Sequence, residues 1–273
     1  MYTVKDAILK RRSVRTFSGL PLSEEDAQRL TELLGRLDNP FGVPVQFRML
    51  DAKAHGLSSA VIVGTDRYVA AKVRRAPQFE LALGYSFEKF CLDAAALGIG
   101  TVMLAATFSR AAAEKAIELE SGEVMPLVSP VGYPADKMSV REKLMRKGTK
   151  ADDRLPFETL FFDGSFARSL TPEAAGRFRD ALEMVRLAPS AANKQPWRCV
   201  VCGDVAHFYK KSAKALVSDA TGDIQKVDIG IALAHFDLTL REAGISGRFF
   251  AEDPGLVSDD TPEYIISCEI NRG

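Results

Sequence analysis

The chain has 273 residues, of which 47% are hydrophobic and 26% are charged, a composition typical of a globular protein. Its 36 basic and 36 acidic side chains give a formal net charge of zero. This balance argues against a general nucleic-acid binder, which usually carries a basic excess. The length fits one large domain or two of average size, and it suffices to bury a core without disulfides or metals.

The sequence predicts neither secretion nor membrane insertion. Residues 1–6 lack the apolar core of a signal peptide. The longest apolar stretch, 94–108, is shorter than the about 20 residues that a membrane span requires. Cys199 and Cys202 form a C-x-x-C motif, but on the strand expected there they would point to opposite faces, and no second ligand pair completes a zinc site. We therefore expect free thiols, no metal and a cytoplasmic location.

Helices and strands alternate irregularly along the predicted chain. In the first half we expect helices at 3–10, 23–37, 79–97 and 110–119, an extended segment at 11–17, strands at 45–50, 60–63 and 127–131, and a basic loop around a short helix at 136–156. In the second half we expect helices at 171–187 and 227–243, a loop at 189–195, and strands at 196–202 and 264–270. This order favours an α+β fold, and no G-x-G-x-x-G motif of a dinucleotide-binding fold follows a strand.

The long apolar helices of the two halves share a pattern. At a constant offset of 146 residues, Gly84 aligns with Gly230, Leu92 with Leu238, Gly98 with Gly244, and Ile99 with Ile245. A second pair of helix ends, 36–37 and 186–187, aligns at an offset of 150. Two matches in the same order predict a duplicated unit, with a first half at 1–162 and a second at 163–273. We expect the two halves to form one intramolecular pseudo-dimer.

Residues 10–17, Lys-Arg-Arg-Ser-Val-Arg-Thr-Phe, place four basic side chains within six positions. If the segment is extended, Arg11, Ser13 and Arg15 share one face, and Arg12 and Val14 share the other. Two guanidinium groups with a hydroxyl between them suit a phosphate, because arginine offers a planar fork of donors. Taken alone, however, the segment fits a solvated basic turn better than a binding site, because charged runs are common on surfaces.

Residues 187–197, Leu-Ala-Pro-Ser-Ala-Ala-Asn-Lys-Gln-Pro-Trp, form a second unusual segment. Its two prolines fix the backbone, its small residues allow close approach, and Ser190, Asn193 and Gln195 offer hydrogen-bonding groups. Such a loop suits holding a flat polar heterocycle by its edge. It fits equally well a connection in which Ser190 and Asn193 cap each other's backbone.

Together the two segments resemble the sequence marks of the FMN-dependent nitroreductase family. In that family Arg-Arg-Ser-Val-Arg-x-Phe (11–17 here) and Ala-Pro-Ser-x-x-Asn-x-Gln-Pro-Trp (188–197 here) usually lie in one short chain and meet at a homodimer interface. Here the first half has 38–44 in place of the Pro-Ser loop, and the second half has 163–169 in place of the basic segment. The resemblance implies a nitroreductase-like α+β pseudo-dimer with one complete flavin site and one vacant site per chain.

The resemblance also implies roles for particular residues. Arg11 and Ser13 would hold the flavin phosphate and ribityl chain, and Arg15 would lie nearer the pyrimidine edge. The implied cofactor-binding residues are Arg11, Arg12, Ser13 and Arg15 of the basic segment, Lys147 and Arg154 near the end of the first half, Pro189, Ser190, Ala191 and Asn193 of the loop, and Leu104, Ala105 and Ala106, where the family more often has Leu-Gly-Gly.

The implied activity is that of an FMN-dependent NAD(P)H oxidoreductase. Hydride would pass from NAD(P)H through the flavin to a nitroaromatic, quinone or similar small-molecule acceptor in ping-pong turnover, with no catalytic side chain required. A flavin carrier or sensor without turnover stays open, as does a flavin-free interaction module. The sequence does not distinguish NADH from NADPH. Whether the fused chain dimerises further stays open, because fusion removes the usual reason for a dimer.

Overall fold

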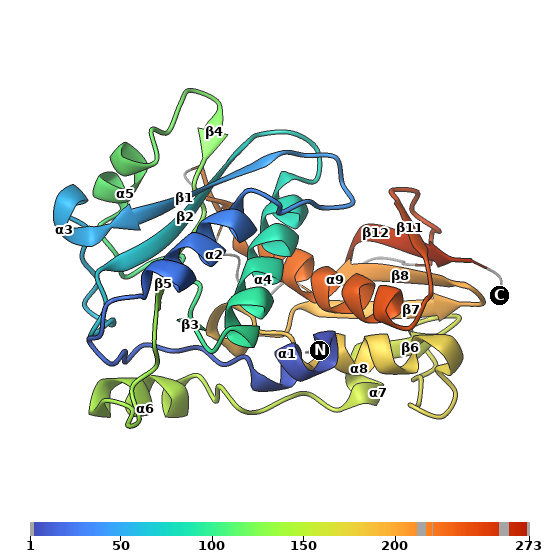
Figure 1. Cartoon of the computed structure of the whole chain (residues 1–273). Coiled ribbons are helices and arrows are strands. Elements are labelled where there is room, and N and C mark those ends of the chain that lie inside the picture. Colours follow the sequence, from blue (N-terminus) through green and yellow to red (C-terminus); the bar gives the residue numbers. More distant parts are fainter. Residues whose placement is uncertain (1–2, 212–216, 220, 257–261, 272–273) are drawn as a thin grey trace.

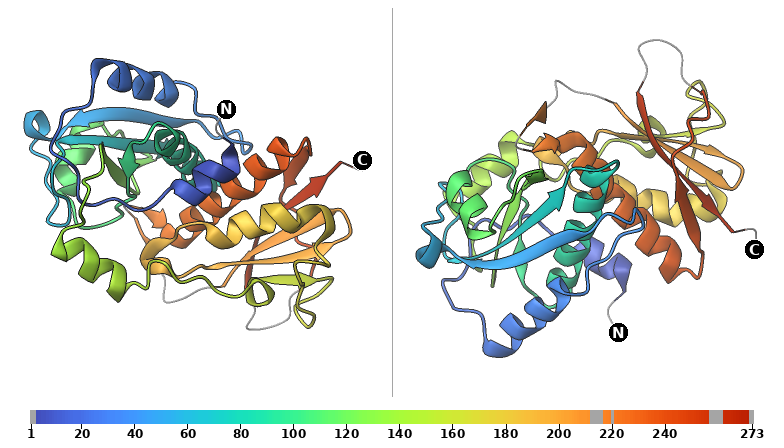
Figure 2. Two further views of the ribbon diagram at one scale, coloured as in Figure 1. Left: turned by 60° about the horizontal axis from the view of Figure 1, so that its bottom comes forward. Right: turned by 90° about the horizontal axis from the view of Figure 1, so that it is seen from above.

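The computed structural model describes residues 3–211, 217–219, 221–256 and 262–271. Two long helices, α4 (Phe79–Ala96) and α9 (Ile224–Glu242), lie side by side at the centre, with one sheet beyond each of them (Figures 1 and 2). Most positions of both helices are buried on all sides, which explains why their apolar residues surround the helix rather than form a stripe.

The two sheets have the same strand order. In the first, the order is β1-β2-β5-β3, with β4 beside β2; in the second it is β11-β12-β8-β7-β6. Strands β1, β2, β5 and β3 therefore correspond to β7, β8, β12 and β11, and each neighbouring pair of these is antiparallel. The strands are β1 (Val45–Asp51), β2 (Arg67–Arg74), β3 (Gly100–Thr101), β4 (Glu123–Val124), β5 (Val128–Gly132), β6 (Phe161–Asp163), β7 (Trp197–Cys202), β8 (Val205–Lys210), β11 (Gly247–Phe250) and β12 (Glu263–Ile270), with β9 (Val217–Ser218) and β10 (Gly222–Asp223) as a separate pair.

Shorter helices surround this frame. Thr3 and Ser23 accept backbone N–H groups at the starts of α1 and α2. These helices are α1 (Val4–Lys10), α2 (Glu24–Leu34), α3 (Ala52–His55), α5 (Arg110–Ala116), α6 (Val140–Gly148), α7 (Phe157–Leu160) and α8 (Arg179–Leu187), and two short 3₁₀ turns are η1 (Gly176–Phe178) and η2 (Ala191–Asn193).

The repeated glycines lie where α4 and α9 cross. A Cβ added at Gly84 would lie 2.1 Å from the carbonyl oxygen of Val227, and one at Gly230 would lie 2.3 Å from that of Leu81. Leu81 and Val227 are related by the same offset of 146 as the glycines. The two contacts are therefore copies of one another, as a pseudo-twofold axis between the helices requires. The predicted pseudo-dimer is confirmed.

Two predicted elements are wrong. No strand spans 60–63, where Val63 makes one bridge to Thr16 and Gly64 then turns with a φ of 85°. The predicted helix at 171–187 begins instead at Arg179, because Gly176 takes a left-handed φ of 52° that an α-helix cannot continue through. Strands β2, β8 and β11 were not predicted. Strands β2 and β11 pair with strands distant in sequence, whereas β8 forms a hairpin with β7 across residues 203–204.

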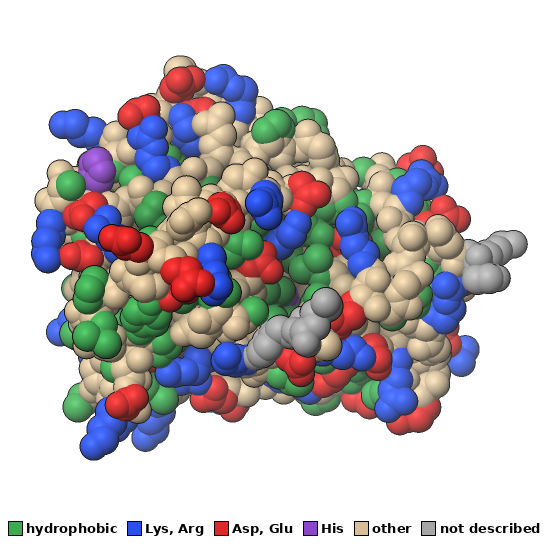
Figure 3. Space-filling view, in the orientation of Figure 1, with side chains coloured by type: hydrophobic (Ala, Val, Ile, Leu, Met, Phe, Trp, Pro, Cys, Tyr) green, Lys and Arg blue, Asp and Glu red, His purple; other side chains and the backbone are tan. Residues whose placement is uncertain are grey.

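The end of the first half extends to the second sheet. Strand β6 contains the predicted boundary between residues 162 and 163, and it pairs in parallel with β7. The boundary itself stays a prediction. Among the described residues, no helix is long and apolar enough to cross a membrane. Basic and acidic side chains are interspersed over the face seen in Figure 3, which agrees with the balanced composition.

Candidate functional site

A cavity lies between the basic segment of the first half and the Pro-Ser loop of the second. It consists of two adjoining compartments, which share Arg11, Ser13, Arg15, Pro189, Ser190 and Ala192. The apolar compartment is further lined by Cys91, Thr101, Val102, Met103, Ala105, Leu127, Ala191, Ile224, Val227, Asp228 and Ile231. The basic compartment is further lined by Arg12, Arg146, Thr149, Ala151, Asp152, Arg154 and Asn193.

The basic segment is extended, as predicted. The backbone N–H of Val14 donates to the carbonyl of Thr101 at 2.9 Å. The Val14 side chain is buried against Gly100, where a Cβ would lie only 2.9 Å from the valine Cβ. Because side chains alternate along an extended chain, burial of Val14 turns Arg11, Ser13 and Arg15 toward the cavity. The predicted common face of these three residues is confirmed.

Arg11 forms an ion pair with the buried carboxylate of Glu88. Its Nε lies 3.2 Å from Oε1 of Glu88 on α4, and the same oxygen lies 2.9 Å from Nε2 of His235 on α9. The other ring nitrogen of His235 lies 2.8 Å from the carbonyl oxygen of Met184. Glu88 is fully buried. This chain of contacts connects the cavity to the interface between the two halves.

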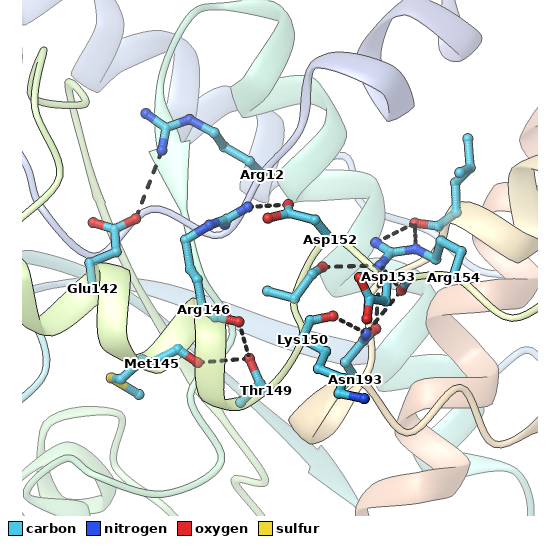
Figure 4. A network of polar contacts seen from close by, with 12 residues as sticks. Arg12, Glu142, Met145, Arg146, Thr149, Lys150, Asp152, Asp153, Arg154 and Asn193 are labelled. Carbon is cyan, nitrogen blue, oxygen red and sulfur yellow. Dashed lines mark hydrogen bonds and ion pairs between the residues drawn. The ribbon is translucent and has the colours of Figure 1, made fainter.

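The basic compartment gathers guanidinium groups from three segments (Figure 4). Arg12 lies 3.8 Å from the buried carboxylate of Glu142, and Arg146 of α6 pairs with Asp152. Arg154 lines the same compartment but points its donors at oxygens of the surrounding chain. It donates to the carbonyls of Ala151, Asp153 and Leu187 and to Oδ1 of Asn193 at 2.8 to 3.4 Å.

Arg15 differs from its neighbours because no ion pair or hydrogen bond of its side chain is found among the described residues, and its buried Nε lacks a partner. Burial lowers the pKa of Arg15, and the nearby Glu142 carboxylate offsets part of this effect. Arginine nevertheless keeps its charge in proteins. A half-buried cation without a direct partner, at the junction of the two compartments, is suited to an anionic or electron-rich ligand group.

The Pro-Ser loop has a strained backbone. Ala192, Asn193 and Gln195 all take left-handed φ values, of 49°, 55° and 48°. Such conformations cost free energy in residues other than glycine and concentrate at functional sites. Hydrogen bonds hold this shape, because Oγ of Ser190 accepts from the Gln195 N–H at 2.8 Å and Nδ2 of Asn193 donates to the carbonyl of Lys150 at 2.6 Å.

A carboxyl group from α9 also fixes the loop. Oδ1 of Asp228 accepts the backbone N–H of Ala191 at 2.9 Å, and Asp228 is almost fully buried in the wall of the apolar compartment. Burial raises the pKa of Asp228 well above its ordinary value, and the hydrogen bond from Ala191 opposes this shift only in part. No role was predicted for Asp228 from the sequence, although an acidic side chain within the apolar run of α9 is an available signal.

Most of the predicted site residues lie together, and three do not line the cavity. Leu104 is buried elsewhere, with its N–H donated to the carbonyl of Val128 at 2.8 Å, so that donor cannot serve a ligand. Ala106 lies beyond the cavity wall, whereas Ala105 lines it. Lys147 is exposed on α6, and the preceding Arg146 lines the basic compartment instead, because successive helical residues point about 100° apart. Asn193 borders the basic compartment and not the apolar one.

The position related to this cavity by the pseudo-twofold axis is filled by side chains. Phe41, at offset 150 from Ala191, has its ring 6.0 Å from that of Tyr85 and 5.5 Å from that of Phe249. The Tyr85 hydroxyl donates to buried Asp237 at 2.6 Å. The aromatic residues of this loop and its neighbours pack against the core at that position. The expectation of a second site without flavin stays a prediction, and this packing supports it.

The four cysteines are free, and Cys199 and Cys202 do not form a metal site; within the described ranges no group of three His, Cys, Asp or Glu side chains could hold a metal ion. Burial raises the pKa of Cys199 well above its usual value. It also raises that of Cys268 to about 12. These thiols therefore behave as small buried hydrophobic groups.

Comparison with known proteins agrees with this architecture. Residues 3–240 match the family model described as "Putative TM nitroreductase". A "putative nitroreductase" from Thermotoga maritima aligns over 98% of this chain and 93% of its own, with 19% identity and a TM-score of 0.63. A "Putative NADH dehydrogenase/NAD(P)H nitroreductase" from Bacteroides thetaiotaomicron covers 50% of this chain and 89% of its own, with 21% identity and a TM-score of 0.42. An "FMN-dependent Nitroreductase" from Clostridium difficile R20291 covers 49% and 88%, with 12% identity and a TM-score of 0.41. The search of curated protein sequences gives no significant match.

The fold is thus nitroreductase-like α+β, with two related halves fused in one chain. Because this family model matches residues 3–240, most of the chain, the chain belongs to the nitroreductase family that the model describes. The resemblance seen in residues 11–17 and 188–197 is confirmed at the level of the family.

Proposed function

We propose that the chain is an FMN-dependent NAD(P)H oxidoreductase with one flavin site, reducing a nitroaromatic, quinone or similar small molecule. The observation that carries the proposal is the cavity between the halves. Its basic compartment continues into an apolar one, and the two share the face formed by Arg11, Ser13 and Arg15. An elongated ligand with a phosphate at one end and a flat ring system at the other matches this arrangement.

The residues of the basic compartment fit a phosphate. Arg12 and Arg146 supply guanidinium donors, and Ser13 supplies a hydroxyl. Arg15, at the junction of the two compartments, has no partner for its buried Nε, which is costly for a charged group unless a ligand compensates it. In this proposal Arg154 acts differently from the role implied by the resemblance: it holds the loops at 151–153 and 187 in place, and so shapes the compartment.

The residues of the apolar compartment fit a flat ring. Met103, Ile224, Val227 and Ile231 offer apolar surface on the walls, and the loop at 189–192 closes one side. Bound FMN would accept hydride from NAD(P)H and pass the electrons to the acceptor. The protein would orient the ring, exclude water from it, and place the Arg15 charge where negative charge develops. No partner chain is needed, because both halves of the site belong to the same chain.

The experiment is to titrate the purified protein with FMN and then follow NADH and NADPH oxidation with menadione or nitrofurazone as acceptor. Binding of FMN with acceptor-dependent oxidation supports the proposal. Binding without turnover would instead make the chain a flavin carrier, and failure to bind FMN would remove the flavin assignment. As a matched pair, Arg15→Ala is expected to weaken FMN binding, whereas Arg29→Ala, on the exposed face of α2, is expected to leave it unchanged.

A further inference from the structure

Asp228 is a buried carboxyl group that the proposed chemistry does not use. One oxygen, Oδ1, accepts the Ala191 N–H at 2.9 Å. The other, Oδ2, is buried and has no hydrogen-bond partner among the described residues. The side chain is 3% exposed and lines the apolar compartment. An unpaired oxygen at such a place is unusual, because buried polar groups normally have partners.

The surroundings favour the neutral form of this carboxyl group. No cation pairs with it among the described residues, and the acidic Asp223, which caps the start of its helix, raises the pKa of Asp228 further. Lys226 of the same helix pairs with Glu263 instead. The other titratable groups that line the compartment are Arg11 and Arg15 of the basic segment and Cys91 of α4. Arg11 is already paired with Glu88. A neutral carboxyl group carries one O–H donor, and with Oδ1 occupied this donor resides on Oδ2.

We propose that Asp228 acts as a neutral carboxylic acid that donates a hydrogen bond from Oδ2 to an acceptor atom of the ring bound in the apolar compartment. The inference rests on the proposed function for the identity of that ring, a flavin. In this proposal Asp228 makes two contacts. Oδ1 accepts from Ala191 and so fixes the loop, and Oδ2 donates to a ring that presents a carbonyl oxygen or an unprotonated nitrogen at its edge. A purely apolar ring would leave the donor unsatisfied and would bind less well.

Substitutions of Asp228 can distinguish hydrogen-bond donation by a neutral side chain from an effect of carboxylate charge. Asp228→Asn keeps an acceptor for Ala191 and a donor for the ligand, so FMN and riboflavin should bind with dissociation constants within about twofold of those of the unchanged protein. Asp228→Leu has a similar size and loses both contacts, so both ligands should bind about tenfold more weakly, the value of one hydrogen bond. Riboflavin is included because it lacks the phosphate and therefore reports on the ring.

Infrared difference spectroscopy gives a readout that loop positioning alone would not change. With ¹³C-labelled aspartate, the unchanged protein at pH 7 should show a carboxylic acid C=O band that is absent from Asp228→Asn, and the band should shift when FMN is added. A carboxylate in place of the acid, or an acid band that FMN does not move, would overturn the inference while leaving the proposed function intact. Failure of the unchanged protein to bind FMN or riboflavin would overturn both.

Discussion

The crossing of α4 and α9 allows a prediction whose size follows from the structure. In Gly84→Ala, the new Cβ would lie 2.1 Å from the carbonyl oxygen of Val227, whereas ordinary van der Waals contact begins at 3.4 Å. The obstacle is backbone, so no rotamer change relieves it, and the helices must separate by about 1.3 Å at their crossing. Overpacking typically costs about 1 to 3 kcal/mol. We therefore expect a loss near the upper limit, about 3 kcal/mol in the free energy of unfolding.

The internal repeat leads to a second prediction, for Gly230→Ala and for the double variant. Gly230→Ala should cost about as much, because its Cβ would lie 2.3 Å from the carbonyl oxygen of Leu81 at the pseudo-symmetric contact. One separation of the helices relieves both contacts, so the double variant should cost less than the sum of the single variants, by about 1 kcal/mol or more. If the two costs simply add, the contacts do not share one interface and the pseudo-twofold reasoning fails.

The assay is urea denaturation followed by circular dichroism, with Gly148→Ala as the matched control. Gly148 ends α6, and a Cβ there would meet nothing within 4 Å. Alanine at that position should raise the free energy of unfolding slightly, by up to about 1 kcal/mol, because alanine is the better helix former. A Gly84→Ala variant as stable as this control would refute the close approach of the helices.

Three further predictions concern single side chains. Glu88→Gln should lower the free energy of unfolding by about 3 kcal/mol, because it leaves the guanidinium of Arg11 buried without its counter-charge, and phosphate or FMN should restore part of the loss in thermal melts. The pKa of Asp228 is raised in the folded state, so above pH 4 only the folded state keeps the proton on this carboxyl group. The free energy of unfolding of the unchanged protein, measured relative to that of Asp228→Asn, should therefore fall by about 1.4 kcal/mol for each pH unit above 4. A maleimide at pH 8 should label Cys202 before the other three cysteines, which are buried.

Each of these has a contrary result. For Glu88, a loss that phosphate and FMN leave unchanged would show that Arg11 does not contact the ligand anion. For Asp228, a stability difference that is constant between pH 4 and 6 would mean that the carboxyl group ionises in the folded protein. For the cysteines, equally fast labelling of Cys199 and Cys202 in mass spectra would contradict the buried position of Cys199 on β7.

Local patterns in the sequence were sufficient to predict the basic segment and the central helices. The extended conformation of 11–17 follows from alternation, and the structure adds the reason, which is burial of Val14 against Gly100. The equivalence of Gly84 and Gly230 could be read because close helix packing leaves room for glycine alone. Such signals lie within a few neighbouring residues, or in one repeated helix.

The features that were not predicted depend on contacts between segments distant in sequence, which a single sequence does not reveal. Phe41 gives no local sign that it fills the second cavity, because its partners Tyr85 and Phe249 lie far along the chain. The choice between Arg146 and Lys147 depends on the rotation of α6 about its axis. The unpartnered oxygen of Asp228 becomes visible only once the Pro-Ser loop is placed against α9.

The central claim is that the two halves form one flavin site between them and that core side chains fill the other position. Its most direct measurement is the number of FMN molecules bound per chain at saturation, by equilibrium dialysis of the purified, flavin-stripped protein. The account predicts one. Two would show that Phe41 and its neighbours do not fill the second position, and none would contradict the assignment of the cavity at Arg11, Arg15 and Ser190 to a flavin.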